Sequence, residues 1–162
     1  MNNIHLWKGE QKMKSLIVYA SKHHGNTKKL VEYLAARQKV DLVDAEKSEN
    51  VDYENYDLIG FASGIDFGKF YPSVIELAEQ LPAGKKVYAL YTCAKDQQKY
   101  GLQVKEIALM CGCRWLGKYG CKGWNTYGPW KLIGGINKNH PSAEELAKAE
   151  QFYLHILQEA KI

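Results

Sequence analysis

Long hydrophobic runs are absent from this sequence of 162 residues. No apolar stretch approaches the roughly 20 residues that a membrane-spanning helix requires, so insertion into a membrane is not expected. The first 15 residues also lack the apolar core and the small-residue cleavage site of a secretory signal. We therefore expect a cytoplasmic protein.

Cysteine is scarce, and its spacing excludes two common uses of the residue. The four cysteines are Cys93, Cys111, Cys113 and Cys121. No two are spaced as Cys-x-x-Cys, and no histidine lies close by in the sequence to complete a zinc site. Four thiols in a chain of this length do not make a disulfide framework, so we expect them to be reduced and structural. The adjacent His23 and His24 lack a third metal ligand, and no metal site is predicted.

A strong excess of charge of one sign is missing as well. The chain carries 22 basic and 18 acidic residues, and a net charge of +4 is too weak to indicate a nucleic-acid partner. The distribution is uneven, because residues 41–66 carry eight acids against one lysine and residues 114–138 carry five bases and no acid. This pattern is typical of a two-sided surface, and it slightly favours acidic partners or anionic small molecules.

Strand-like and helix-like segments alternate along the chain from residue 14 onward. Short runs rich in β-branched and aromatic residues predict five strands, at residues 15–20, 40–43, 57–62, 86–91 and 114–119. Apolar residues at helical spacing predict four helices, at residues 26–37, 73–81, 100–111 and 142–157. The last helix is preceded by a capping-box pattern of Ser142 and Glu145. Its inner face is predicted to be Leu146, Ala149, Tyr153 and Ile156.

This alternation predicts a three-layer α/β fold. Right-handed crossovers give a five-stranded parallel sheet in the order 2-1-3-4-5 with helices on both faces. We divide the chain into an N-terminal tail, residues 1–13, and a single domain, residues 14–162. Ligands of such sheets bind beyond the carboxyl ends of the strands. The loops after the first, third and fourth strands are therefore the candidate site.

The loop after the first strand has the composition of a phosphate-binding turn. It contains Ser21, His23, His24, Gly25, Asn26 and Thr27, and it leads directly into a predicted helix. A helix N-terminus offers unpaired N–H groups and partial positive charge, both of which favour an anion. Gly25 lets the backbone close around that anion, and two hydroxyl groups add donors. The loop fits neither the Walker pattern nor the Gly-x-Gly-x-x-Gly turn. The competing interpretation is a capped turn that binds nothing.

The loop after the third strand combines glycine with aromatic side chains. Its first residues are Ser63, Gly64, Ile65, Asp66 and Phe67. Glycine allows the main chain to approach a flat ring, and the rings of Phe67, Phe70 and Tyr71 offer faces for stacking. The alternative is that these aromatic residues are core beneath a loop.

At this point the sequence resembles a known family. The Ser-x-x-His-Gly-Asn-Thr stretch at residues 21–27 is similar to the FMN-phosphate loop of the flavodoxin family, usually Thr/Ser-x-Thr-Gly-x-Thr, with one extra residue. The resemblance implies a flavodoxin-like fold and FMN as the cofactor. It also implies that Ser63 to Phe67 flank the flavin ring, and that backbone N–H groups of Thr92, Cys93 and Ala94 bind its pyrimidine edge.

The resemblance implies electron transfer through noncovalently bound FMN, with a redox partner protein or a small electron acceptor. Two other hypotheses stay open. The second hypothesis is an FMN-dependent oxidoreductase that reduces a quinone or a similar acceptor. Residues 56–71 are also similar to flavodoxin-type protoporphyrinogen oxidases. In addition, most flavodoxins are acidic, whereas this chain is basic. The third is a binding module that kept the fold and lost the flavin.

The segment of residues 115–130 carries Trp124, Tyr127 and Trp130 among glycines and lysines. We expect these aromatic residues to pack a long connection onto the domain. The alternative is that they form a lip beside the flavin.

Overall fold

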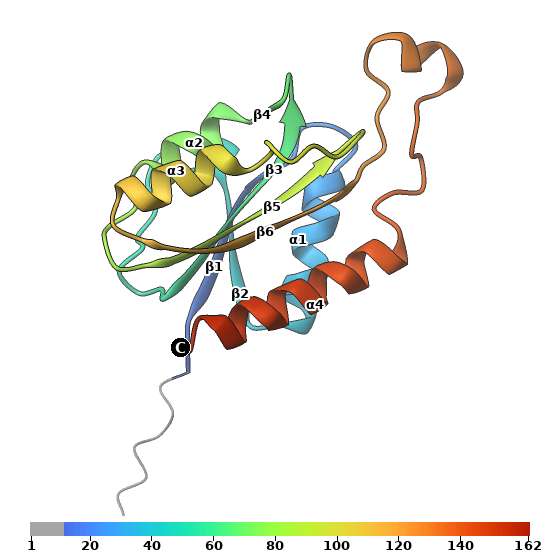
Figure 1. The fold of residues 1–162 in the computed structure, drawn as a ribbon. Coiled ribbons are helices and arrows are strands. Elements are labelled where there is room, and N and C mark those ends of the chain that lie inside the picture. Colours follow the sequence, from blue (N-terminus) through green and yellow to red (C-terminus); the bar gives the residue numbers. More distant parts are fainter. Residues whose placement is uncertain (1–11) are drawn as a thin grey trace, which may run out of the picture.

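The computed structural model describes residues 12–162 and contains one central parallel sheet (Figure 1). Its five long strands are β1 (Ser15–Ala20), β2 (Val40–Asp44), β3 (Leu58–Asp66), β5 (Lys86–Cys93) and β6 (Arg114–Lys122). They lie in the order β2-β1-β3-β5-β6, and every neighbouring pair is parallel. The predicted fold class and strand order are confirmed. The numbering differs only because a short extra strand, β4 (Lys69–Phe70), pairs antiparallel with β3.

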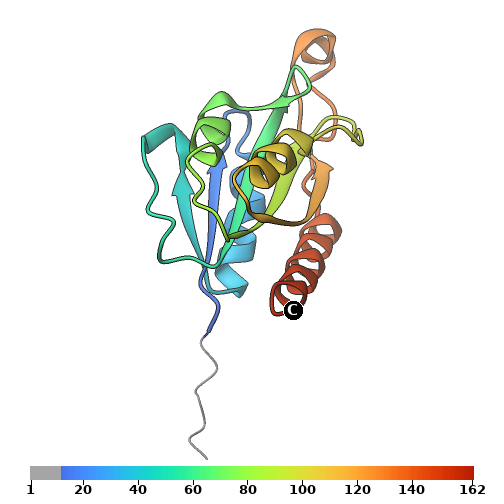
Figure 2. The same ribbon diagram turned by 60° about the vertical axis from the view of Figure 1, so that its left-hand side comes forward.

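Helices cover both faces of the sheet (Figures 1 and 2). One face carries α1 (Asn26–Arg37) and α4 (Ala143–Glu159), and the other carries α2 (Pro72–Ala78) and α3 (Leu102–Met110). Acidic residues 44–56 contain one short 3-10 helix, η1 (Ala45–Lys47). None of the helices within residues 12–162 is long and apolar enough to cross a membrane.

The sheet is buried on both faces, and the sequence shows why. All six residues of β1 are buried, as are the first seven of β3 and the last seven of β5. Continuous apolar runs of this kind are typical of parallel strands that are covered by helices on both sides. The predicted inner face of α4 is confirmed, because Leu146, Ala149, Tyr153 and Ile156 are all buried. Each such large side chain stabilises the fold by about 1.5–3 kcal/mol.

The end of β3 differs from the prediction. The sequence pattern predicts a strand that ends at residue 62, and this is wrong, because β3 continues to Asp66. Ser63 and Gly64 still pair with β5, and Asp66 pairs with Lys69 of β4. The expected loop is therefore a strand extension closed by a hairpin, which the apolar pattern missed because glycine and aspartate are poor strand formers.

The connection from β6 to α4, residues 123–141, projects from the body of the domain beside the upper ends of the strands (Figures 1 and 2). It contains the 3-10 helix η2 (Gly128–Ile133). The predicted tail, residues 1–13, lies almost wholly outside the described residues, and the domain division stays a prediction.

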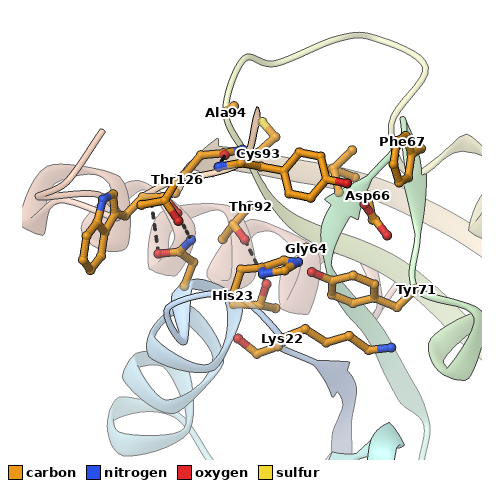
Figure 3. A pocket seen from close by; sticks show the side chains of 18 residues that line it. Lys22, His23, Gly64, Asp66, Phe67, Tyr71, Thr92, Cys93, Ala94 and Thr126 are labelled. Carbon is orange, nitrogen blue, oxygen red and sulfur yellow. Dashed lines mark hydrogen bonds between the residues drawn. The ribbon is translucent and has the colours of Figure 1, made fainter. Parts of the chain in front are cut away.

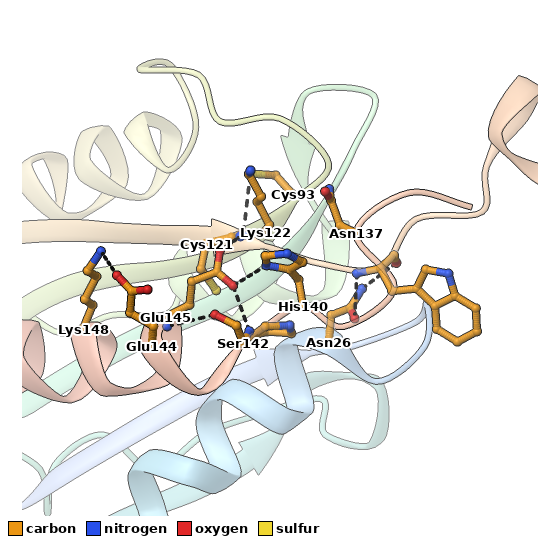
Figure 4. A network of polar contacts seen from close by, with 12 residues as sticks. Asn26, Cys93, Cys121, Lys122, Asn137, His140, Ser142, Glu144, Glu145 and Lys148 are labelled. Atoms are coloured by element: carbon orange, nitrogen blue, oxygen red, sulfur yellow. Dashed lines mark hydrogen bonds and ion pairs between the residues drawn. The ribbon is translucent and has the colours of Figure 1, made fainter. Parts of the chain in front are cut away.

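One carboxylate fastens both ends of this connection (Figure 4). Glu145 accepts hydrogen bonds from the backbone N–H of Lys122 at 3.1 Å and of Ser142 at 2.8 Å. His140 Nδ1 lies 2.6 Å from the same carboxylate, and the predicted capping box of Ser142 and Glu145 is present. Burial by itself raises the pKa of Glu145, but the hydrogen bonds from Ser142, His140 and Lys122 outweigh it and leave that pKa below its usual value.

We predict that Glu145→Gln lowers the free energy of unfolding at pH 7 by about 1–2 kcal/mol, because charge-assisted bonds at a helix start are lost. Since the folded pKa of Glu145 is depressed, this contribution is complete above the unfolded pKa and disappears as pH falls through the folded value. Denaturant unfolding at pH 7 and at about pH 3 measures the difference. Glu144→Gln, which removes only an exposed pair with Lys148, is the control and changes stability much less. An equal loss in both variants contradicts the assignment.

Candidate functional site

A pocket of about 240 Å³ opens at the carboxyl edge of the sheet (Figure 3). Four segments surround it: the loop after β1, the end of β3 with its hairpin, the loop after β5 and the start of the connection after β6. Among the predicted site residues, those that line it are Ser21, His23, Asn26, Thr27, Gly64, Ile65, Asp66, Phe67, Thr92, Cys93 and Ala94. The topology therefore brings the three predicted loops together, as expected for strands that run in the same direction.

The loop after β1 ends in a left-handed turn at the start of α1. His24 has φ = 53° and Gly25 has φ = 66°, and Gly25 is the residue that precedes the helix. Within residues 12–162, the backbone N–H groups of His24, Gly25 and Thr27 have no protein acceptor. Unpaired donors at a helix N-terminus are the usual setting for binding a phosphate group.

A buried hydrogen bond joins this loop to the centre of the sheet. Thr27 Oγ1 lies 2.9 Å from Thr92 Oγ1, and both side chains are almost fully buried. Ser21 Oγ accepts a hydrogen bond from the backbone N–H of Lys28 at 3.1 Å. These contacts hold the first turn of α1 against the end of β5, beside the pocket.

The β3 side of the pocket is packed tightly behind the backbone. Ser63 Oγ donates to the carbonyl of Gly64 at 2.7 Å and accepts from the backbone N–H of Tyr71 at 2.9 Å. A Cβ atom at Gly64 would lie 2.8 Å from Tyr71 Oη, so no larger residue fits without movement. Burial and the carboxylates of Asp66 and Glu46 raise the pKa of Tyr71 to about 12. This phenol therefore stays protonated at neutral pH.

Phe67 occupies an unusual backbone position at the pocket mouth. The hairpin from β3 to β4 turns at Phe67 (φ = 47°) and Gly68 (φ = 80°), between the paired residues Asp66 and Lys69. Two positive φ angles define a turn that favours glycine, asparagine or aspartate, so a large aromatic residue there is strained. Phe67 is also 83% exposed, and its ring meets Tyr127 edge-on at 6.0 Å. Strain at an exposed aromatic residue points to a role in binding.

The β5 side of the pocket contains an inert thiol. Cys93 is buried, and its Sγ donates to the carbonyl of Cys121 at 3.6 Å. Burial, with smaller effects of Asp96 and Glu145, raises its pKa to about 12, so it is not a reactive thiolate at neutral pH. The carbonyl of Ala94 accepts from Asn137 Nδ2 at 2.9 Å, which ties this loop to the connection after β6. All four cysteines are free thiols.

A fourth wall, residues 123–127, is held by side chains of the phosphate-binding loop. Asn26 makes two hydrogen bonds with the backbone of Trp124: its Nδ2 donates to the carbonyl at 2.8 Å, and its Oδ1 accepts from the N–H at 3.1 Å. His24 stacks on the Trp124 ring with centroids 3.8 Å apart, and its Nε2 lies 2.8 Å from Thr126 Oγ1. A Cβ atom at Gly123 would lie 2.7 Å from Asn26 Nδ2, so the two segments are in direct contact.

Three of the predicted site residues do not line the pocket: His24, Gly25 and Ser63. His24 turns outward onto Trp124, Gly25 contributes backbone only, and Ser63 is buried behind Gly64. The lining residues outside the predicted set are Lys22, residues 123–127 and Tyr71, whose ring was considered only as a stacking face. The aromatic residues and glycines at 123–128 were the available signal. Trp124 packs onto the domain, as we expected for these aromatic residues. Tyr127 is exposed and lies at the pocket mouth, which agrees with the alternative that they form a lip.

Comparison with known proteins identifies this arrangement. The family model described as "Flavodoxin domain" matches residues 16–110, which is more than half of the chain and includes the phosphate-binding loop and β5. The chain belongs to the flavodoxin family. Membership in this family makes it an FMN-binding electron-transfer flavoprotein, and FMN is the cofactor.

The similar proteins cover at least 90% of this flavodoxin-family chain. It is 38% identical over 148 residues to the uncharacterised protein MJ0298 of Methanocaldococcus jannaschii, covering 90% of this chain and 99% of that protein. Oxidised flavodoxin 1 of Bacillus cereus has the same fold (TM-score 0.63, 19% identity, 90% of this chain and 97% of that one). The Flv1 flavodiiron core of Synechocystis sp. PCC6803 also shares it (TM-score 0.66, 14% identity, 94% of this chain and 37% of that one).

We predict that Asn26→Ala weakens FMN binding roughly tenfold, because two hydrogen bonds of about 0.5–1.5 kcal/mol each no longer hold residues 123–127 against the phosphate-binding loop. Titration of the apoprotein with FMN, followed by flavin fluorescence, measures the dissociation constant. Asn55→Ala serves as the control, because Asn55 bonds only within its own exposed turn. An unchanged dissociation constant for Asn26→Ala would show that the fourth wall does not contribute to binding.

Proposed function

We propose that this flavodoxin-family protein is an electron carrier that binds FMN noncovalently and exchanges electrons with a partner at the pocket mouth. The observation that carries the proposal is the pocket itself, in which an anion site at the start of α1 adjoins a cleft edged by Phe67 and Tyr127. When bound, FMN supplies the electron-transfer chemistry. The residues around it bind and orient the cofactor and set its electrostatic surroundings.

The phosphate group of FMN fits the start of α1. The unpaired backbone N–H groups of His24, Gly25 and Thr27 supply donors, and the helix terminus supplies partial positive charge. The side chain of Lys22, which lines the pocket, is partly engaged with Glu46 at 3.3 Å. The anion site therefore depends chiefly on backbone dipoles, which do not titrate.

The ring system of FMN fits the space between the β3 hairpin and residues 123–127. Gly64 brings main chain to the pocket surface without a side chain, and Phe67 and Tyr127 provide aromatic faces. The pocket of about 240 Å³ is slightly smaller than common ligand pockets of about 300–1,000 Å³. Phe67 and Tyr127 meet edge-on at the mouth, and both side chains are exposed.

The pocket walls favour simple electron exchange. Tyr71 and Cys93 both stay protonated at neutral pH, because their pKa values are raised to about 12. These two side chains therefore present neutral surfaces, while Lys22 and Asp66 are charged residues that also line the pocket. The mouth opens beside exposed Phe67 and Tyr127, so a partner can accept electrons there without entering the protein.

A flavin-dependent oxidoreductase is the second candidate function. The specific observation in its favour is the pair of exposed aromatic rings at the mouth, which could also stack a flat quinone. Steady-state turnover of NAD(P)H with a quinone by the lone protein would favour this candidate over the carrier.

We predict that the purified protein contains one FMN per chain, released intact by denaturation because no covalent link holds it. The absorption spectrum and chromatography of the released cofactor test this directly. Stepwise reductive titration should show two separate one-electron steps, as a carrier requires, and turnover of NAD(P)H with a quinone should be negligible. A colourless protein that takes up no added FMN would overturn the proposal and favour the binding module.

A further inference from the structure

The segment of residues 123–137 presents apolar side chains to solvent right beside the pocket. Tyr127 lines the pocket and is itself exposed, and η2 begins at the next residue. Further along, Trp130, Leu132 (90% exposed) and Ile133 (69% exposed) stand on η2, none of whose residues is buried. We call Tyr127, Trp130, Leu132 and Ile133 the apolar tip. Large apolar side chains gathered in this way mark an interaction site.

Hydrogen bonds within residues 124–136 hold the apolar tip in its conformation. Asn125 and Ile136 pair as an antiparallel bridge, with N–H to carbonyl distances of 3.0 and 2.8 Å. The backbone N–H of Gly135 donates to the carbonyl of Trp130 at 2.7 Å, and Trp124 Nε1 donates to the carbonyl of Gly134 at 3.3 Å. A braced segment loses little freedom on binding, so it presents its apolar side chains at low entropic cost.

Unpaired lysines surround the pocket mouth from both sides. Lys131 is on η2 and Lys138 Nζ lies 5.8 Å from the Trp124 ring centroid, while Lys69 is on β4 and Lys99 reaches the turn at Gly68. Within residues 12–162, none of these four lysines has an acidic side chain within ion-pair distance. Residues 114–138 contain no acid at all. Asp66 is the one acidic residue among those that line the pocket, so these lysines outnumber it at the rim.

We propose that the apolar tip and these four lysines form the docking surface for an acidic redox protein. The inference rests on the proposed function, because the partner exchanges electrons with FMN at the mouth. The apolar tip supplies the desolvated centre of the contact, with tryptophan and tyrosine as anchors, and the lysines steer a negatively charged partner onto it. Because the lysines flank the mouth on both sides, the contact is centred on the pocket. A bilayer would instead touch the projecting η2 alone.

The test measures electron transfer from a reduced, acidic iron–sulfur ferredoxin to the FMN-loaded protein by stopped-flow absorbance. We expect the second-order rate constant to fall at least fivefold when the salt concentration rises from about 20 to about 500 mM, because opposite charges attract. Lys131→Glu should slow the reaction about three- to tenfold at low salt, and Leu132→Ser with Ile133→Ser should slow it at all salt concentrations.

Matched controls are available on α3, away from the pocket. Leu109→Ser with Met110→Ser removes two exposed apolar side chains, and Lys105→Glu reverses one lysine that has no ion pair within the described residues. These controls should react with the ferredoxin at the unaltered rate. FMN content and the rate of reduction by dithionite, measured for every variant, should match those of the unaltered protein.

Three outcomes would overturn the docking surface. The tip variants could react at the unaltered rate or slow no more than the α3 controls. A basic c-type cytochrome could react faster than the ferredoxin and slow as salt rises. Or the tip variants could react with the ferredoxin at the unaltered rate and no longer sediment with anionic phospholipid vesicles, which would assign the tip to a membrane surface. Failure of the proposed function is distinguished from failure of the docking surface, because the FMN content of each protein is measured before any partner is added.

Discussion

Parallel pairing of β1 with β3 and of β3 with β5 determines where each part of the pocket lies. Parallel strands all end at one edge of the sheet, so the loops after β1, β3 and β5 meet there although they are far apart in the sequence. The buried hydrogen bond between Thr27 and Thr92 then joins the start of α1 to the end of β5. The anion site and the cleft beside it are consequences of this one arrangement.

The connection after β6 takes part in both the pocket and the surface beside its mouth. Its first residues close the pocket, held by Asn26 and His24 of the phosphate-binding loop, and its base is fastened by Glu145. The same segment carries the apolar tip outward. One braced segment therefore forms both a wall of the pocket and the surface beside its mouth that we propose for partner docking.

Charge distinguishes the two parts of the site. In the pocket, burial keeps Tyr71 and Cys93 protonated and neutral, and the proposed anion site uses backbone dipoles, although Lys22 and Asp66 also line the pocket. The rim instead carries lysines without acidic partners among the described residues. Backbone dipoles do not titrate, whereas the charges of lysines act at long range on the approach of a partner.

The sequence by itself determined the strand order, the helices and three of the four pocket segments, because short apolar runs of strand length, helical spacing and the glycine-containing turn at residues 21–27 are local signals. It did not predict that β3 continues to Asp66, since the pairing of Ser63 and Gly64 with β5 overrides their weak strand preference. Nor could it place Trp124 against His24, or residues 123–127 against the loop after β1. Those positions depend on contacts between residues about a hundred positions apart, such as Asn26 with Trp124, and only the tertiary structure brings such residues together.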